Sequence, residues 1–411
     1  MSTVPNCAHC GSPLTTTLVD LGEQPLSNSY VKPEDAGKPE PYYPLHTRVC
    51  GTCFLVAADD VVPADVHFSA DYAYFSSFST SWLAHAKAYA KKMTADLSLT
   101  GDDLVMEIAS NDGYLLQYFV SAGIPVLGIE PTANTANAAA LKGVPSYVAF
   151  WGNDLATRLK GEGVRPALIA SANVLAHVPD INDFVRGIAT ILTGDAVYTV
   201  EFPHLLNMMQ LTQFDTIYHE HYSYLSLIAV QNIFEAAGLR VFEVEDLPTH
   251  GGSLRVYGCL KDATHAERPG VATVRAKEEA AGLNTLSGYA GFTARCEAVR
   301  TGLLAFLDQA DADGKSVAAY GAAAKGNTLL NYCDIKADRI AYCVDRNPAK
   351  QNTLLPGSQV PVKGVEALDA NPPDYLLILP WNLRDEISAQ MAHLKDTQFV
   401  VAIPEVTVWR P

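Results

Sequence analysis

Leu104-Val105-Met106-Glu107-Ile108-Ala109-Ser110-Asn111-Asp112-Gly113 is the stretch from which the fold of this chain is predicted. Its first six residues are mostly apolar, which is typical of a buried strand, and Ser-Asn-Asp-Gly then ends that strand as a turn. A helical pattern follows at once, from about Tyr114 to Ala122. Because a strand that leads directly into a helix is the repeating unit of parallel sheets, the stretch predicts an α/β fold.

The same alternation continues on both sides of this unit. The apolar spacing predicts a helix from Trp82 to Leu97 before it, and more strands after it. The expected strands are Val126–Pro131, Tyr147–Ala149, Ala167–Asn173 and Ala196–Phe202, followed by Leu239–Leu247 and Ser253–Leu260 around a short turn. We therefore predict a doubly wound parallel sheet that an antiparallel hairpin closes.

The last quarter of the chain repeats the pattern on a smaller scale. After a helical stretch from about Ala272 to Leu307, the expected strands are Ser316–Tyr320, Ile340–Val344, Tyr375–Leu379 and Phe399–Ile403. Gly321-Ala322-Ala323-Ala324-Lys325-Gly326-Asn327 lies where the first of them turns into a helix, a place where backbone N–H groups meet phosphate. We predict a second, smaller Rossmann-like domain here.

Composition sets outer limits on the class of protein. A chain of 411 residues is too long for one ordinary core and predicts two or three domains. No apolar run approaches the roughly 18 residues that a membrane span needs, and the first residues do not resemble a signal peptide, so we expect a cytoplasmic protein without a membrane partner. The net charge of −16 disfavours nucleic acid as a partner but allows a small phosphate-bearing ligand.

Four of the eight cysteines form two C-x-x-C pairs, Cys7 with Cys10 and Cys50 with Cys53. In a reducing cytoplasm this spacing predicts one structural zinc held by four thiolates, with two disulfides or a redox pair as alternatives. Residues up to about 67 carry few periodic apolar positions, so we expect the metal to supply their folding energy.

Polar residues cluster at the predicted carboxyl edge of the central sheet, where open sheets bind ligands. The loop after the first strand lacks the three spaced glycines of a dinucleotide site, which disfavours NAD. The second strand ends in a carboxylate that is suited to ribose hydroxyls, and together these features favour S-adenosylmethionine. The candidate cofactor-binding residues are Glu107, Ser110, Asn111, Gly113, Glu130 and Asn173. The alternative is a tight turn that Asn111 or Asp112 caps.

Tyr218-His219-Glu220-His221-Tyr222-Ser223-Tyr224 concentrates acid and base groups in seven residues. It predicts a catalytic centre, and a solvated polar loop is the alternative. His177, after the fourth strand, faces either a substrate or the core. Tyr72 and Tyr74 precede the first helix, where aromatic residues are usually packing residues.

These motifs, in this order, resemble the zinc-containing sugar C-methyltransferases of deoxysugar biosynthesis. The resemblance covers essentially the whole chain and rests on the two cysteine pairs, Tyr72–Ser77, Glu107–Gly113, Asn173–Val178, Phe214-Asp215-x-x-Tyr218-x-Glu220-His221, His250-Gly251-Gly252 and Tyr320–Gly326. It implies that S-adenosylmethionine methylates C-3' of a nucleotide-linked 4-keto-6-deoxyhexose, with His221 as general base and Glu220, Tyr218, His177 and Tyr72 around the sugar. Phe75 stands where some relatives carry a polar residue, which leaves the identity of the sugar open.

The chemistry agrees with this resemblance. A carbon beside a ketone becomes nucleophilic only after it loses a proton, so the enzyme needs a positioned base and donors for the enolate oxygen. Glu220 is expected to hold the tautomer of His221, and the substrate is expected to contact Tyr222, Gly321, Lys325, Gly326 and Asn327.

We predict a zinc-binding domain over residues 1–67, a class I methyltransferase domain over 68–283 and a Rossmann-like domain over 284–411. O- or N-methylation and a non-catalytic, zinc-dependent nucleotide-sugar binder are the alternatives. The sequence leaves the nucleotide, the methylated face and the oligomeric state open, with a monomer as one option.

Overall fold

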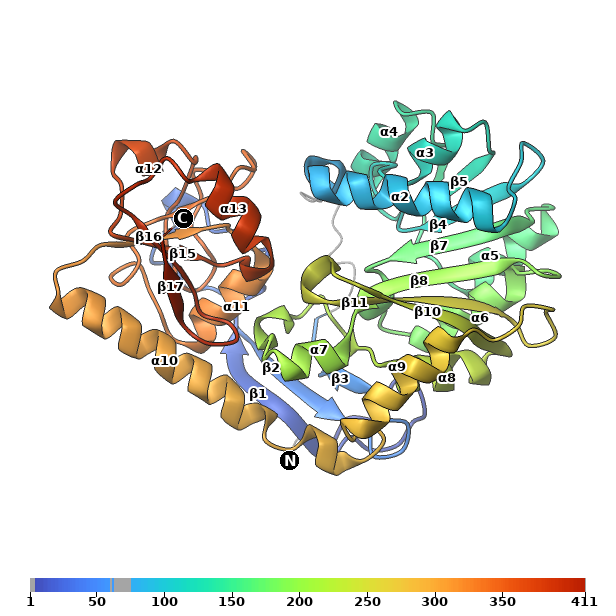
Figure 1. Cartoon of the computed structure of the whole chain (residues 1–411), viewed down its shortest axis with the longest axis horizontal. Helices are drawn as coiled ribbons and strands as arrows, with labels where there is room; N and C mark the ends of the chain where they lie inside the picture. Colours follow the sequence, from blue (N-terminus) through green and yellow to red (C-terminus); the bar gives the residue numbers. More distant parts are fainter. Residues whose placement is uncertain (1–3, 60, 63–74, 411) are drawn as a thin grey trace.

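The computed structural model describes residues 4–59, 61–62 and 75–410, and its main feature is a seven-stranded sheet with helices on both faces (Figure 1). The strand order is β10-β11-β8-β7-β4-β5-β6, with β11 antiparallel to both of its neighbours. The strands are β4 (Leu104–Ile108), β5 (Val126–Ile129), β6 (Ser146–Tyr147), β7 (Pro166–Ala172), β8 (Val197–Pro203), β10 (Leu239–Leu247) and β11 (Ser253–Leu260). The predicted doubly wound sheet with a closing hairpin is confirmed.

Two layers of helices cover this sheet. The upper layer in Figure 1 consists of α2 (Thr80–Asp96), α3 (Leu116–Ser121) and α4 (Ala133–Ala140). The lower layer consists of α5 (Asn153–Gly161), α6 (Ile181–Ile191), α8 (Leu227–Ala236) and α9 (Pro269–Ala280). Asp180 caps the beginning of α6, because its side chain accepts a hydrogen bond from the Asp183 N–H, and the helix buries Ile181, Phe184 and Ile188 at helical spacing.

The C-terminal part contains a six-stranded sheet in the order β14-β13-β12-β15-β16-β17. Its strands are β12 (Val317–Tyr320), β13 (Cys343–Val344), β14 (Val362–Lys363), β15 (Tyr375–Ile378), β16 (Gln398–Val401) and the antiparallel β17 (Thr407–Trp409). Its helices are α10 (Phe292–Ala312), α11 (Ala324–Tyr332), α12 (Ala367–Ala370) and α13 (Arg384–Gln390). The sequence missed β14 and β17 because strands this short show no periodicity.

A four-stranded sheet joins the N-terminal segment to a piece of the central domain. It consists of β1 (Thr16–Gln24), β2 (Tyr43–Val49), β3 (Val56–Ala58) and β9 (Ser223–Tyr224), and β9 belongs to the predicted catalytic stretch. Helix α7 (Leu205–Gln210) precedes that stretch, and α10 runs alongside β1 (Figure 1).

The expectation that the metal supplies the folding energy of the N-terminal segment is corrected in one respect. Leu18, Leu45 and Val56 are buried in the same hydrophobic cluster as Phe292 and Leu303 of α10. The segment therefore shares a core with the C-terminal part, and zinc is not its sole source of folding energy. The predicted domain boundaries at residues 67 and 283 stay predictions. Among the described helices, none is both long and apolar enough to cross a membrane.

One buried carboxylate fastens α9 to the beginning of α8. The Glu278 side chain, which is fully buried, accepts hydrogen bonds from the backbone N–H groups of Leu227 and Ile228 at 2.6 and 2.9 Å and from His204 Nε2 at 2.7 Å. The first N–H groups of a helix have no partner within the helix, so Glu278 supplies what α8 lacks.

We expect Glu278→Ala to lower the free energy of unfolding by about 3 to 5 kcal/mol, because it leaves buried donors without a partner. Glu279→Ala, next to it on the exposed face of α9, should change stability by less than about 0.5 kcal/mol. Denaturant unfolding of both variants makes the comparison. Equal stabilities would show that Glu278 does not fasten the two helices.

Candidate active site

The loop after β4 has backbone angles of the strained kind that is common at functional sites. Ala109 and Asn111 have φ angles of 56° and 48°, in the left-handed region that residues other than glycine rarely adopt, and Gly113 has 74°. Asn111 is held on both sides, because its N–H donates to Glu130 Oε2 at 2.8 Å and its Oδ1 accepts from the Ser76 N–H at 2.9 Å. The loop therefore keeps a costly conformation at the carboxyl edge of the sheet.

Buried polar atoms without a hydrogen-bond partner gather around this loop. Among the described residues they include both carboxylate oxygens of Glu107, Ser110 Oγ, Asp112 Oδ1 and, at the end of the neighbouring strand, Asn173 Oδ1. Burial raises the pKa of Glu107 well above its usual range, Tyr114 opposes this rise, and the nearby Glu130 and Asp112 carboxylates add to it. An unpaired buried polar atom costs about 1 to 3 kcal/mol, so the set indicates a polar ligand and fits S-adenosylmethionine.

Glu130 lies where the sequence placed it, and its carboxylate already has protein partners. It accepts from Asn111 N and, at 2.9 and 2.5 Å, from the N–H and hydroxyl of Thr132. A carboxylate has about four lone-pair sites, so a ribose would add to these bonds or replace some of them. Lys142 also holds the loop, through Asp112 Oδ2 at 3.0 Å and Ser77 Oγ at 2.6 Å. Sequence reasoning missed Lys142, because a single lysine after a helix matches no motif.

The four predicted metal ligands come together. The Sγ atoms of Cys7, Cys10, Cys50 and Cys53 all lie within 4.8 Å of one another, and the closest pairs are 3.4 and 3.5 Å apart. Thiolates around one zinc lie about 3.8 Å apart, so the cluster fits one tetrahedral ion. Cys50 Sγ also accepts the backbone N–H groups of Thr52 and Cys53, as a thiolate would. Such a site has no open position, which makes it structural.

His221 is the centre of a cluster of rings. The centroids of Tyr218, His177 and Tyr224 lie 4.0, 4.6 and 6.1 Å from that of the His221 ring. His221 Nδ1 donates to the Thr216 carbonyl oxygen at 2.9 Å. A carbonyl oxygen only accepts, so the proton of the neutral ring lies on Nδ1 and Nε2 keeps its lone pair.

Burial lowers the pKa of His221 well below its usual value of 6.5, and the charges of His177, Lys325 and His250 lower it further, against the hydrogen bond to Thr216. His221 is therefore neutral near pH 7. The arrangement provides a buried imidazole with a fixed tautomer and one nitrogen that is able to take a proton.

The expectation that Glu220 holds the His221 ring is wrong, because Thr216 fills this role. Glu220 Oε1 instead accepts from Asn28 Nδ2 of the N-terminal segment at 2.5 Å. Burial raises the pKa of Glu220, while Asn28 and Lys350 oppose this rise. Successive side chains of an irregular loop point in different directions, so neighbours in sequence need not share a site.

Two further residues of the stretch, His219 and Tyr222, also form hydrogen bonds with backbone carbonyls elsewhere in the fold. His219 Nε2 donates to the Tyr43 carbonyl at 3.3 Å, and the Tyr222 hydroxyl donates to the Val62 carbonyl at 3.0 Å. Tyr218, His221 and Tyr224 are thus the members that meet in the ring cluster. Tyr72 and Tyr74 lie outside the described residues.

Lys325, in the C-terminal part of the chain, lies close enough to His221 to affect its pKa. Its Nζ donates to Asn382 Oδ1 at 2.9 Å and lies 4.7 Å from the ring centroid of Trp381. Trp381 Nε1 donates to Asp215 Oδ2 at 2.8 Å. Burial raises the pKa of Asp215 to about 6, against the charge of Lys325, and burial lowers the pKa of Lys325. Sequence reasoning missed Asp215 and Trp381 as parts of the site, although Asp215 stands in one of the quoted motifs.

The other predicted substrate contacts in the C-terminal part, Gly321, Gly326 and Asn327, have structural roles in the fold. A Cβ atom at Gly321 would lie 2.5 Å from Pro380, and one at Gly326 would lie 2.8 Å from Leu379, so close packing requires both glycines. Asn327 is 1% exposed, and its Nδ2 donates to the Ser27 carbonyl at 2.6 Å. Its visible contact holds the N-terminal segment.

We expect purified, reduced protein to contain about one zinc per chain, because a four-thiolate site holds one ion. Cys10→Ser should lose the metal and lower the thermal midpoint, whereas Thr52→Ala, whose exposed side chain is no ligand, should keep both. Elemental analysis and thermal unfolding with and without a chelator measure this. Full zinc content in the Cys10→Ser variant would exclude Cys10 as a ligand.

Glu130→Ala should weaken S-adenosylmethionine binding by about 1 to 3 kcal/mol, as expected for the loss of charged hydrogen bonds to the ribose. Thr132→Val removes one donor from the carboxylate and keeps its charge, so its effect should be smaller. Calorimetry of both variants separates direct binding from support of the loop. If both lose the same affinity, Glu130 acts only through the loop.

Comparisons with known proteins agree with this division of the chain. Three family profiles match: a "Putative zinc binding domain" over residues 7–68, a "Methyltransferase domain" over 82–244 and a "C-methyltransferase C-terminal domain" over 248–404. The chain is 35% identical over 411 residues to the C-methyltransferase NovU of Streptomyces niveus, covering 98% of this chain and 97% of that relative.

Similar solved structures cover less than half of the chain. The magnesium protoporphyrin IX methyltransferase of Synechocystis PCC 6803 is 14% identical and covers 43% of this chain and 78% of its own, with a TM-score of 0.34. A SAM-dependent methyltransferase of Anabaena variabilis is 10% identical and covers 42% and 83%, with a TM-score of 0.35. Similarities this weak support no argument about function. The full-length relative does support an argument about function. The chain belongs to the C-methyltransferase family of NovU as an S-adenosylmethionine-dependent C-methyltransferase, with a four-cysteine cluster that is consistent with zinc.

Proposed function

We propose that this enzyme methylates C-3' of a nucleotide-linked 4-keto-6-deoxyhexose and that His221 is the general base. The observation that carries the proposal is the hydrogen bond from His221 Nδ1 to the Thr216 carbonyl, because it leaves Nε2 as the nitrogen with a lone pair. The sugar and the position of methylation rest on the resemblance of the sequence motifs. Membership of a C-methyltransferase family excludes the alternatives of O- or N-methylation and of a non-catalytic binding protein.

The chemistry assigns a task to each residue near His221. S-adenosylmethionine supplies an electrophilic methyl group when it is bound at the carboxyl edge of β4, β5 and β7. His221 Nε2 removes the proton from the carbon beside the ketone, and the electron pair of the C–H bond moves onto the ketone oxygen. His177 and Tyr218 lie against the His221 ring, which supports the proposal that both contact the sugar. Tyr72 stays a proposed member of this group.

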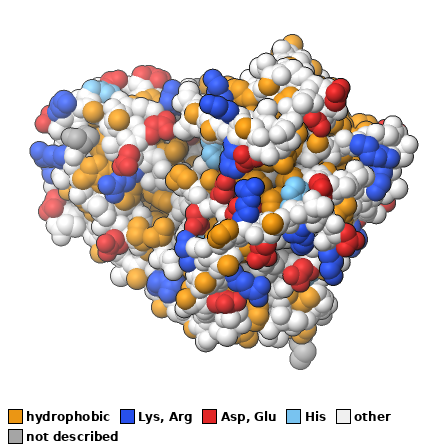
Figure 2. Space-filling view, turned by 45° about the vertical axis from the view of Figure 1, so that its right-hand side comes forward, with side chains coloured by type: hydrophobic (Ala, Val, Ile, Leu, Met, Phe, Trp, Pro, Cys, Tyr) orange, Lys and Arg blue, Asp and Glu red, His pale blue; other side chains and the backbone are white. Residues whose placement is uncertain are grey.

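The local charge favours a negatively charged substrate and transition state. Lys325 is close enough to lower the pKa values of both His221 and His250. On the face shown in Figure 2, Lys and Arg side chains are scattered among Asp and Glu rather than gathered in one patch. In a chain of net charge −16, the buried Lys325 provides a local positive charge for such a substrate.

We propose that Lys325 and the beginning of α11, with Gly321, Gly326 and Asn327 shaping the turn, bind the diphosphate of the substrate. From there the Lys325 charge also helps to stabilise the enolate. Tyr222 stays a predicted substrate contact, and its hydroxyl donates to the Val62 carbonyl. A cytoplasmic location is part of the same proposal.

Turnover of a panel of nucleoside-diphosphate 4-keto-6-deoxyhexoses, followed by mass spectrometry, tests the substrate class. With the best substrate, His221→Asn should lower kcat by about 10² to 10⁴, because a general base contributes about that much. His219→Asn is the matched control and should turn over normally, because His219 faces Tyr43. Exchange of the C-3' hydrogen with heavy water, with an unreactive cofactor analogue bound, should be lost in the His221 variant alone. Near-normal methylation by folded His221→Asn would mean that another residue is the base.

The acid limb of the rate profile should lie below pH 6.5. His221 must be neutral to act as a base, so kcat/KM rises with pH as the ring loses its proton and then levels off. Because the pKa of His221 lies well below 6.5, the plateau should begin by about pH 6.5. A half-maximal rate above pH 7 would contradict this assignment.

A further inference from the structure

The turn between β10 and β11 holds a strained histidine. His250 has a φ angle of 54°, in the left-handed region, which costs about 1 to 3 kcal/mol for a residue other than glycine or asparagine. Bonds on both sides enforce this conformation: Gln213 Nε2 donates to the Gly251 carbonyl and Ser253 Oγ to the Thr249 carbonyl, each at 2.9 Å. The surroundings therefore fix the place of the His250 ring.

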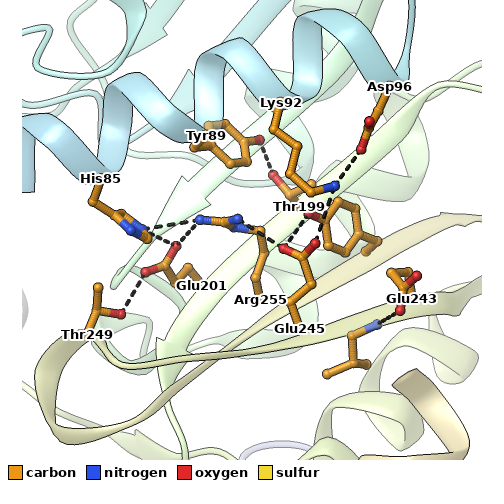
Figure 3. A network of polar contacts seen from close by, with 12 residues as sticks. His85, Tyr89, Lys92, Asp96, Thr199, Glu201, Glu243, Glu245, Thr249 and Arg255 are labelled. Atoms are coloured by element: carbon orange, nitrogen blue, oxygen red, sulfur yellow. Dashed lines mark hydrogen bonds and ion pairs between the residues drawn. The ribbon is translucent and has the colours of Figure 1, made fainter. Parts of the chain in front are cut away.

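A network of charged groups ties the same turn to the sheet (Figure 3). Thr249 Oγ1 donates to Glu201 Oε1 at 3.0 Å. Glu201 Oε2 accepts from Arg255 Nη2 at 3.0 Å and from His85 Nε2 of α2 at 2.9 Å. Burial favours the protonated form of Glu201, but His85 and Arg255 outweigh it and lower its pKa, so the carboxylate is charged. The turn is thus anchored to β8, β11 and α2 together.

The ring of His250 has an unused nitrogen. It packs edge-on against Trp82, with ring centroids 5.1 Å apart, and its Nδ1 is buried without a hydrogen-bond partner among the described residues. Burial, followed by the charge of Lys325, lowers the pKa of His250 to about 4, so the ring is neutral. A buried nitrogen without a partner carries a desolvation cost that a bound ligand would remove.

Contacts place this turn on the wall of the His221 site. A Cβ atom at Gly251 would lie 2.3 Å from the Trp381 ring, so the turn packs directly on Trp381. Trp381 in turn lies under Lys325 Nζ and donates to Asp215.

Asp215 completes the series of contacts from the turn to His221. It directly precedes Thr216, whose carbonyl accepts the hydrogen bond from His221 Nδ1. A positive charge on His250 would also lower the pKa of His221, which indicates that the two rings lie within electrostatic range of each other. His250 thus lies between Trp82 of α2 and the turn that packs on Trp381, at the border of the His221 site.

We propose that His250 is a further substrate-binding residue, whose imidazole forms a hydrogen bond with an oxygen of the methyl acceptor. This inference rests on the proposed function. A neutral imidazole has one N–H donor and one lone pair, so it suits either the ketone oxygen or a hydroxyl group of a keto-sugar. Its fixed place would turn the sugar so that the correct carbon meets His221.

His250→Gly and His250→Asn form a matched pair of variants. Both residues tolerate the left-handed conformation, and the amide of asparagine keeps a polar group close to the position of Nδ1. With the panel keto-sugar that the wild type methylates fastest, His250→Gly should lower kcat/KM by about 3- to 10-fold, the usual effect of one neutral hydrogen bond, and His250→Asn should lose less. Both variants should fold, and their S-adenosylmethionine affinity should stay at the wild-type value. His265→Asn, beyond the other end of the hairpin, is the control and should behave as wild type.

The outcomes separate this inference from the function on which it rests. If the wild type methylates no keto-sugar, the proposed function fails and the role of His250 fails with it. If the wild type methylates and His250→Gly keeps kcat/KM within about twofold, this inference alone is overturned. An equal loss of cofactor affinity would also overturn it, because His250 would then act only through the structure. If the glycine variant does not fold, His250→Ser, which also lacks the ring, takes its place.

Discussion

The structure depends on the backbone of residues 214–224, an irregular segment that crosses between all the parts of the chain. Buried backbone groups outside helices and sheets need partners from elsewhere, and here every part supplies one. Thr328 Oγ1 of α11 donates to the Ile217 carbonyl at 2.9 Å, and Tyr224 pairs with Val56 of the N-terminal sheet. These outside partners hold the segment in place. Within it, the Thr216 carbonyl accepts the hydrogen bond that orients His221.

Burial then sets the chemistry of the site that this segment carries. His221 and His250 lose their affinity for protons mainly because charge is costly away from water. Lys325 and Asp215 carry opposite charges, and both contact Trp381. The charge of Lys325 limits the rise that burial causes in the pKa of Asp215, and the charge of Asp215 limits the fall that burial causes in the pKa of Lys325. The result is a group of neutral rings beside one cation, which is an environment that accepts a developing negative charge better than a solvated loop would.

Positioning in this site comes from residues that do not themselves carry the proposed chemistry. Glu201 is bound by Arg255, His85 and Thr249, so it links one strand pair, one helix and the turn of His250 (Figure 3). Such a network is stable when buried because each partner is satisfied. It also explains why the hairpin β10–β11 is more than a cover for the sheet edge.

The sequence alone determined the features that depend on neighbours along the chain. Strand and helix alternation predicted the central sheet, because the period of burial is set within each element. Two C-x-x-C turns predicted the metal cluster, since each turn places two thiolates side by side. The polar residues at the ends of β4, β5 and β7 were predictable because parallel strands all end at one edge.

Only the tertiary structure decided which side chains meet across long separations. Nothing in the stretch 218–224 reveals that Glu220 turns to Asn28 while a backbone carbonyl holds His221. The approach of Lys325 to His221 and the place of His250 against Trp82 join residues far apart in the chain. The same holds for the core that β1 and β2 share with α10. Each of these depends on how whole elements pack, and packing is a property of three-dimensional shape that spacing along one chain does not encode.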